Sequence, residues 1–243
     1  MRSPFTPKTL AFLRALKRHN DREWFRARKA DYEQHVHAPM VEVIGRLADD
    51  FRLFAPELVA DPKASLFRVY RDTRFSEDKT PLKTTAGARF PVRGFAKGRG
   101  AGLYFEIAPG WVWIGGGLYR PEPADLVAIR ETIAVSHPKL RKIVTSRTFS
   151  SILGTLQGDR LTRVPRGFPA DHPAADDLRL KQFLGFKEYD AAFATSPAFY
   201  PELLKVFGVL LPLVRFLNAP LQPVLSRAPG FTDPPGRGGR RGW

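Results

Sequence analysis

Cysteine is absent from this chain of 243 residues, which excludes disulfide bonds, thiolate nucleophiles and cysteine metal sites. Long apolar runs are absent too, since no window reaches the ~20 uncharged apolar residues that a membrane-spanning helix needs. The most apolar stretch, Leu203 to Leu217, is interrupted by two cations and a proline. The N-terminal stretch Phe5 to Leu16 also contains two cations, which breaks up the apolar core of a signal peptide. We therefore expect a cytoplasmic protein that does not bind membranes.

Acidic residues are scarce. The 24 Asp and Glu residues stand against 39 Lys and Arg residues, which gives a formal net charge of +15. A field of that sign favours anionic partners such as nucleic acid, nucleotides or phosphosugars. Arginine outnumbers lysine 27 to 12, as a GC-rich genome would also produce. Such a bias explains the preference for arginine but not the shortage of acids. The charge leaves two explanations open, an anionic partner and a general surface charge.

Apolar periodicity predicts helices at both ends of the chain. Thr6 and Pro7 form a helix start, a cap followed by a first-turn proline, and this helix ends at His19. Asn20 is expected to cap a second helix, with Glu23 in capping-box position. Further helices are predicted at Pro123 to Ser136, Pro138 to Ser146, Ala174 to Leu180 and Pro197 to Leu217.

Strand patterns occupy the middle of the sequence. Leu103 to Ala108 alternates apolar and polar residues, Pro109 and Gly110 predict a turn, and Trp111 to Gly115 returns as the second strand of a hairpin. Further strands are predicted at Leu66 to Arg71, Ala86 to Val92 and Phe183 to Tyr189.

Together these elements predict an α+β fold. We expect a single domain over residues 1–225, with a largely antiparallel sheet flanked by helices, a helical N-terminus and a long C-terminal helix. Three glycines, Gly115 to Gly117, are expected to permit a bulge or a close backbone approach. Residues 226–243 are rich in Arg, Gly and Pro, so their composition predicts a disordered tail.

The segment Arg68 to Lys83, RVYRDTRFSEDKTPLK, crowds many charged side chains into one loop after the first predicted strand. Alternation along that strand places Arg68 and Asp72 on an open face, with Phe67 toward the core. So many cations repel one another unless ion pairs form or a ligand neutralises them. The residues that we expect to contact an anionic ligand here are Arg68, Tyr70, Arg71, Arg74, Lys79 and Lys83.

Local signals within this loop suggest how it is held. Phe75 is expected to anchor it in the core, and Asp78 to brace a turn by accepting backbone amides. Thr80 and Pro81 repeat the helix-start signature, which would present free amides to an anion. The alternative is a structural network of ion pairs that ties the loop to the sheet, because ionic networks also serve structure.

A second group of polar residues surrounds His172. An imidazole beside a carboxylate, here Asp171, is a common arrangement for general acid–base catalysis or metal binding. Asp171 and Pro173 also fit a helix cap, which needs no second site. Arg166 and Lys181 lie in the same stretch and are expected to reach the cavity of the charged loop.

Residues 24–36, 68–84, 115–133 and 164–183 resemble a bacterial and fungal family catalogued as domain of unknown function 2461. The resemblance covers roughly residues 5–217 and implies one domain, a cytosolic protein and no assigned activity. Two departures are His19 in place of an asparagine and Leu82 in place of a tyrosine, whose hydroxyl is therefore missing here. The matching positions are Arg68, Tyr70, Arg71, Asp72, Arg74, Phe75, Ser76, Asp78, Lys79, Pro81, Lys83, Gly115 to Gly117, Arg130, Arg166, Asp171 and His172.

Two hypotheses of different classes follow. The first is a protein that binds a phosphate-bearing or other anionic ligand, nucleic acid or nucleotide, through the cations of the charged loop together with Arg130, Arg166 and Lys181. The second is a hydrolase or transferase acting on a phosphoester, with Asp72, Asp78 and His172 as acid–base groups or metal ligands. No metal site is assigned, and the cofactor and the oligomeric state stay open.

Overall fold

The structure is a computed structural model that describes residues 2–74, 77–96 and 98–221. In chain order the elements are α1 (Pro7–Arg18), α2 (Arg22–Ala27), α3 (Lys29–Tyr32), the π-helix η1 (Glu33–His37), α4 (Ala38–Phe54), α5 (Pro62–Ser65), β1 (Ala86–Pro91), β2 (Gly102–Ile107), β3 (Trp111–Leu118), α6 (Pro123–Val144), α7 (Arg147–Leu153), α8 (Ala175–Leu178), β4 (Phe183–Asp190), the 3-10 helix η2 (Ala191–Thr195) and α9 (Phe199–Asn218). The tail predicted at residues 226–243 and the anchor predicted at Phe75 lie outside the described residues.

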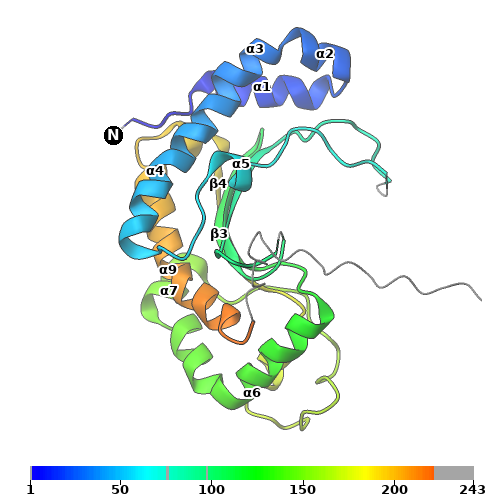
Figure 1. Ribbon diagram of the computed structural model, residues 1–243, viewed down its shortest axis with the longest axis vertical. Coiled ribbons are helices and arrows are strands. Elements are labelled where there is room, and N and C mark those ends of the chain that lie inside the picture. Colours follow the sequence, from blue (N-terminus) through cyan, green and yellow to red (C-terminus); the bar gives the residue numbers. More distant parts are fainter. Residues whose placement is uncertain (1, 75–76, 97, 222–243) are drawn as a thin grey trace, which may run out of the picture.

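The strands form one antiparallel sheet in the order β1-β2-β3-β4. Tyr104 on β2 pairs with Arg89 on β1 and with Gly115 on β3, which in turn pairs with Phe186 on β4. Figure 1 shows α4 and α9 on one side of this sheet, while the described part of the chain places no helix against the other side. The predicted α+β fold, with its helical N-terminus and long C-terminal helix, is confirmed.

The core lies between the sheet and α9. Phe90 on β1 and Phe105 on β2 point to this side and are fully buried. The Phe90 ring lies 5.7 Å from that of Phe207 on α9 and 5.4 Å from that of Phe51 on α4. Burying an aromatic side chain of this size contributes about 2–3 kcal/mol relative to leaving it exposed. One face of the sheet is therefore held by helices, and its alternate side chains are left on the other face.

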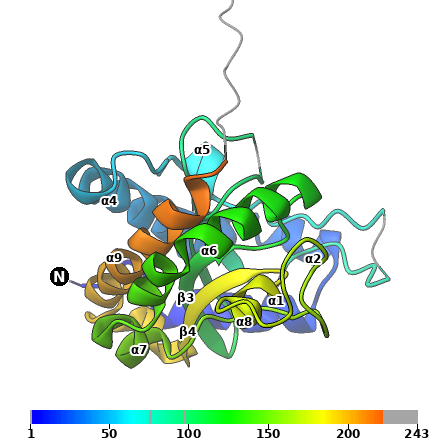
Figure 2. The same ribbon diagram turned by 90° about the horizontal axis from the view of Figure 1, so that it is seen from below.

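The lower end of the molecule is helical. Figure 2 shows α6 lying across this end, where it contacts α7, α8 and α9. Ser136 has non-helical backbone angles inside α6, two residues before Pro138, which explains why the sequence predicted two helices there. The predicted hairpin is confirmed as β2 and β3, and the predicted strand near Phe183 is β4.

At the N-terminus, the predicted start of α1 is confirmed, since Thr6 is the cap and Pro7 the first helical residue. The predicted cap of the second helix is wrong by one residue. Asp21, not Asn20, caps α2, and its side chain accepts the Trp24 N–H at 2.7 Å. The side chain of Asn20 instead forms hydrogen bonds with the backbone of Leu82.

The strand predicted at Leu66 to Arg71 is also wrong. These residues are extended but make only isolated bridges, from Leu66 to Ala88 and from Tyr70 to Leu82. The charged loop consequently precedes the first strand, β1, instead of following it. Phe67, which we expected in the core, is 40% exposed. No helix starts at Thr80 in the described residues, so the amide site predicted there is also wrong.

The close backbone approach predicted for the three glycines is found at Gly117. Its φ is +120°, and a Cβ built on it would lie 2.0 Å from the carbonyl oxygen of Phe183 on β4. Only a residue without a Cβ fits there.

Within the described residues, no helix is long and apolar enough to span a membrane.

Replacing Gly117 tests how much the β3–β4 pairing depends on this approach. We expect Gly117→Ala to lower the free energy of unfolding by more than about 2 kcal/mol. The added Cβ would clash with the carbonyl oxygen of Phe183, and alanine is strained at this positive φ. Gly208 on α9 is the control, since a Cβ there meets no atom within 4 Å. Gly208→Ala is expected to stabilise the helix by about 0.5–1 kcal/mol. Equal urea denaturation curves for the two variants would contradict this account.

Candidate anion-binding site

Residues 66–85, called the arm below, leave the sheet beside β1 and return to it. The Phe67 N–H donates to Gly87 O at 3.0 Å, the Lys83 N–H to Val69 O at 2.7 Å, and the Arg71 N–H to Pro81 O at 2.9 Å. These bonds hold two extended limbs side by side without forming a regular ladder. Figure 1 shows the arm reaching out on the side of the sheet that carries no helix.

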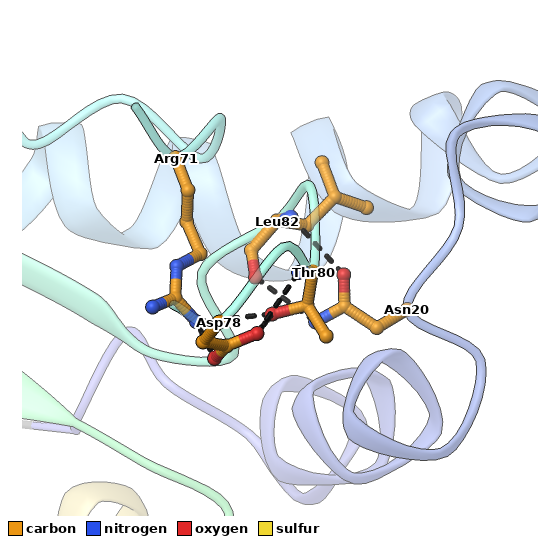
Figure 3. A network of polar contacts seen from close by, with 5 residues as sticks. All are labelled: Asn20, Arg71, Asp78, Thr80 and Leu82. Atoms are coloured by element: carbon orange, nitrogen blue, oxygen red, sulfur yellow. Dashed lines mark hydrogen bonds and ion pairs between the residues drawn. The ribbon is translucent and has the colours of Figure 1, made fainter. Parts of the chain in front are cut away.

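Asn20 fixes the arm to the helical N-terminus (Figure 3). Its side-chain amide donates to Leu82 O at 2.9 Å, and its Oδ1 accepts the Leu82 N–H at 3.0 Å. Leu82 is fully buried, so its backbone groups need such partners. Asn218 on α9 brackets Ala101 in the same way, at 3.1 and 2.8 Å. Two asparagines thus tie irregular backbone to helices.

Arg71 is held inside the arm by its returning limb. Its Nη1 forms an ion pair with Asp78 and donates to the Thr80 hydroxyl at 3.0 Å. Asp78 in turn accepts the backbone N–H of Thr80 at 2.9 Å and the Thr80 hydroxyl at 2.7 Å (Figure 3). These bonds from Thr80, followed by the guanidinium of Arg71, lower the pKa of Asp78. The turn brace predicted for Asp78 is therefore present.

Asp72 and Arg74 form a bidentate pair. The Nε and Nη2 atoms of Arg74 donate to the two carboxylate oxygens of Asp72 at 3.0 and 2.8 Å. Hydrogen bonding from the Arg74 side chain, then from its backbone, lowers the pKa of Asp72 from 3.8 to about 2. Asp72 is therefore ionised at neutral pH and orients the guanidinium of Arg74.

A shallow hollow of about 320 Å³ opens at this end of the arm. Four guanidinium groups and one carboxylate line it, a net charge of +3. Neither Arg22 nor Arg68 forms an ion pair with any described residue, although the charge of Arg68 helps to lower the pKa of the nearby Asp72. The residues that line the hollow are Arg22, Arg68, Tyr70, Arg71, Asp72, Thr73 and Arg74.

The two lysines of the arm do not line the hollow. The Lys79 amino group donates to Thr73 O at 3.0 Å, which closes the arm on itself. The Lys83 amino group lies 4.8 Å from the centre of the Phe67 ring, a cation–π contact. Burial lowers the pKa of Lys83, and the nearby carboxylate of Glu106 acts in the opposite direction. Both lysines have structural contacts within the arm.

The residues around His172 are placed elsewhere. Figure 1 shows the yellow-green segment that precedes β4 toward the lower end of the molecule and the arm toward the upper end. His172 Nδ1 accepts the Ala174 N–H at 3.0 Å, so the imidazole itself holds the turn before α8. The cap predicted at Asp171 is wrong, because α8 begins after Ala174 without a side-chain cap. Arg166 and Lys181 are exposed and do not line the hollow.

Arg130 is structural in the described contacts. It is only 9% exposed, and its Nη2 donates to Leu180 O at 3.0 Å. Desolvation by burial lowers the pKa of its guanidinium. It therefore ties α6 to the chain that leads into β4, whereas we expected it to contact the ligand.

Two contributions were missed by sequence reasoning. Arg22 joins the hollow from α2, and only its place at the first position of a helix beside the arm brings it there. His137 on α6 forms a pair with the buried Asp177 at 3.1 Å, where Arg141 also approaches at 3.8 Å. No periodicity joins residues 40 positions apart, so the sequence carried no signal for this pair.

Within the described residues, no three His, Asp or Glu side chains gather in a way that could hold a metal ion.

A family model described as conserved hypothetical protein (DUF2461) matches residues 8–216, which confirms the resemblance seen in the sequence. No curated protein and no solved structure matches the chain.

The bidentate pair makes a prediction about pH. In Arg74→Ala we expect the pKa of Asp72 to rise from about 2 toward 3.8, because its main hydrogen-bond donor is lost. Since the folded pKa is lowered, the pair stabilises the arm above about pH 4 and loses that effect as pH falls through 2. Carboxyl carbon chemical shifts followed by NMR measure this. Arg71→Ala, the control, should leave the pKa of Asp72 low; a rise of equal size there would refute the assignment.

We call the two hydrogen bonds between the Asn20 side chain and the Leu82 backbone the asparagine clamp, and they make a second prediction. Asn20→Ala leaves the buried N–H and C=O of Leu82 without partners, so we expect a loss of about 1–3 kcal/mol in unfolding free energy. Hydrogen exchange at the Arg71 and Lys83 amides should also accelerate, because the arm is released. The control is Asn218→Ala, which should destabilise the fold similarly without changing exchange in the arm. Unchanged arm protection in Asn20→Ala would show that the clamp does not hold it.

Proposed function

Because the chain belongs to the DUF2461 family of conserved hypothetical proteins, whose description names no reaction, we propose a function from its geometry: it binds a phosphate-bearing ligand, nucleic acid or nucleotide, at the arginine-lined hollow of the arm. One observation carries this proposal. Arg22 and Arg68 line an open hollow of net charge +3 and form no ion pair with any described residue. Two guanidinium groups at one site, neither in an ion pair with a described residue, favour an anion there.

The residue type suits phosphate. A guanidinium presents several N–H donors in a planar fork, which matches two oxygens of a phosphate group. Asp78 and Asp72 hold Arg71 and Arg74 in defined orientations, so these side chains lose little freedom when a ligand arrives. Arg71 uses only Nη1 in its contacts with described residues, so its other donors face no described acceptor.

Binding explains the carboxylates better than catalysis does. The low pKa values of Asp72 and Asp78 keep both groups ionised at neutral pH, so neither carries a proton to donate to a leaving group. Each instead orients an arginine. His172, the remaining group of the hydrolase or transferase hypothesis, does not line the hollow.

A salt titration tests the proposal. We expect the affinity for a labelled single-stranded oligonucleotide to fall steeply as salt rises, because each neutralised phosphate releases counterion. In the double variant Arg22→Ala/Arg68→Ala, the slope of log K against log salt should fall by about 1.4, two contacts of ~0.7 each. Fluorescence anisotropy over a series of salt concentrations measures both.

The matched control removes the same charge far from the hollow. Arg147 and Arg160 are exposed, do not line the hollow and form no ion pair with described residues. Arg147→Ala/Arg160→Ala should retain the slope of the unmodified protein, apart from a small uniform loss of affinity. If both double variants lose affinity equally, net charge and not the hollow accounts for binding. Salt-insensitive binding would remove the proposal altogether.

A further inference from the structure

The face of the sheet that carries no helix presents a row of aromatic side chains. Alternation along the strands points every second residue away from α9. Trp111 and Trp113 on β3 and Phe186 on β4 are partly exposed on that side, whereas Val112 and Ile114 are fully buried on the α9 side. We call Trp111, Trp113 and Phe186 the aromatic ladder.

The rings of the ladder are in contact with one another. The centre of the Trp111 ring lies 4.5 Å from that of Trp113, with 29° between the planes. Trp113 lies 5.1 Å from Phe186 at 31°. Phe186 reaches Trp113 by leaning over Gly115, where a Cβ would come within 2.5 Å of the Phe186 Cβ. A glycine in the middle of β3 therefore lets the ladder cross from one strand to the next.

The ladder lies on the same face as the arm. Phe67, at the root of the arm, packs 6.0 Å from Tyr104 on β2 and covers Gly87 on β1. Lys83 lies over Phe67 on the same side. From β1 to β3 is two strand spacings, about 10 Å. The root of the arm and the aromatic ladder thus lie on the same face of the sheet.

From this arrangement we propose that the ligand is a single-stranded nucleic acid, its phosphates on the arm and its bases on the aromatic ladder. The inference rests on the proposed function and deepens it by naming the ligand class. Every base has a π-face, so stacking on aromatic rings suits single strands of any sequence. A four-stranded antiparallel sheet with helices on one face and aromatics on the other is an established geometry for this kind of binding.

Two carboxylates on the same face of the sheet indicate how a bound strand is oriented. The carboxylate of Glu188 accepts the indole N–H of Trp113, and that of Glu106 accepts the Thr85 hydroxyl. Carboxylates repel phosphates, so the backbone of a bound strand must follow the arm and turn its bases inward. A carboxylate can also accept hydrogen bonds from the amino groups of bases. A duplex does not fit this pattern, because its bases are stacked inside and its outer surface is phosphate.

Three probes of equal length separate the contributions of phosphate and base. They are a single-stranded oligonucleotide, an oligomer of the same sugar–phosphate backbone without bases, and the duplex. We expect the unmodified protein to bind the single strand about tenfold or more tightly than the abasic oligomer, because stacking adds to phosphate contact. The duplex should bind less tightly than the single strand, because its bases are not available to stack on the ladder.

Variants then locate the effect of the bases. Trp111→Leu removes a partly exposed ring but keeps an apolar side chain, and it should abolish most of the preference for bases while leaving abasic binding unchanged. Trp24→Leu is the control, because Trp24 stacks on His19 at the N-terminal helices and is not in the ladder. The Arg22→Ala/Arg68→Ala variant should instead weaken all three probes. If Trp111→Leu fails to fold, the affinity ratio in the unmodified protein still decides the question.

The outcomes are distinguishable. Equal binding of the single strand and the abasic oligomer would overturn the role of the ladder and leave the arm as an anion site. An undiminished preference for bases in a folded Trp111→Leu variant would overturn it too, as would a duplex that binds more tightly than the single strand. If neither single strand nor abasic oligomer binds in a salt-dependent way, the proposed function fails together with this inference.

Discussion

The packing of α9 against one face of the sheet is the constraint on which the rest of the structure depends. Phe90 and Phe105 point toward α9 and are fully buried, and the rings of Phe207 and Phe199 meet them there. Because strand side chains alternate, burying one set on that face necessarily places the other set on the opposite face. No described helix covers that opposite face, so tryptophans that would otherwise be core residues are left partly exposed. The aromatic surface is thus a direct consequence of one-sided packing.

The arm adds charge to this surface, and its own ion pairs explain how so basic a segment stays ordered. Asp78 and Asp72 each neutralise one arginine, while Asn20 ties the returning limb to the N-terminal helices through Leu82. These ion pairs are therefore structural, which is the alternative that the sequence left open. The network is also incomplete, because Arg22 and Arg68 line the hollow and form no ion pair with described residues. The two interpretations of the charged segment therefore apply to different arginines. Arg71 and Arg74 belong to the structural network, whereas Arg22 and Arg68 form the proposed anion site.

Local patterns predicted the elements whose stability is local. The β2–β3 hairpin follows from an alternating strand and a Pro-Gly turn, and the start of α1 follows from a cap and a first-turn proline. The segment from Leu66 failed as a strand because β-forming residues also suit an extended limb, and only a neighbouring strand makes a ladder. Asn20 failed as a cap because Asp21 occupies that role and Leu82, 62 residues away, takes its side chain. Leu82 is fully buried at this clamp.

The sequence by itself determined the fold class, the family and the segment that carries the charge, since composition, periodicity and contiguous motifs express all three. Tertiary structure decided which charges are compensated and which residues meet. Arg22 reaches the hollow from another helix, whereas His172 and Arg130, which the sequence placed with it, make local or buried contacts elsewhere. The physical reason is that ion pairing and burial depend on distances between residues far apart in the chain. A linear pattern specifies which groups can ionise, and only packing specifies what lies beside them.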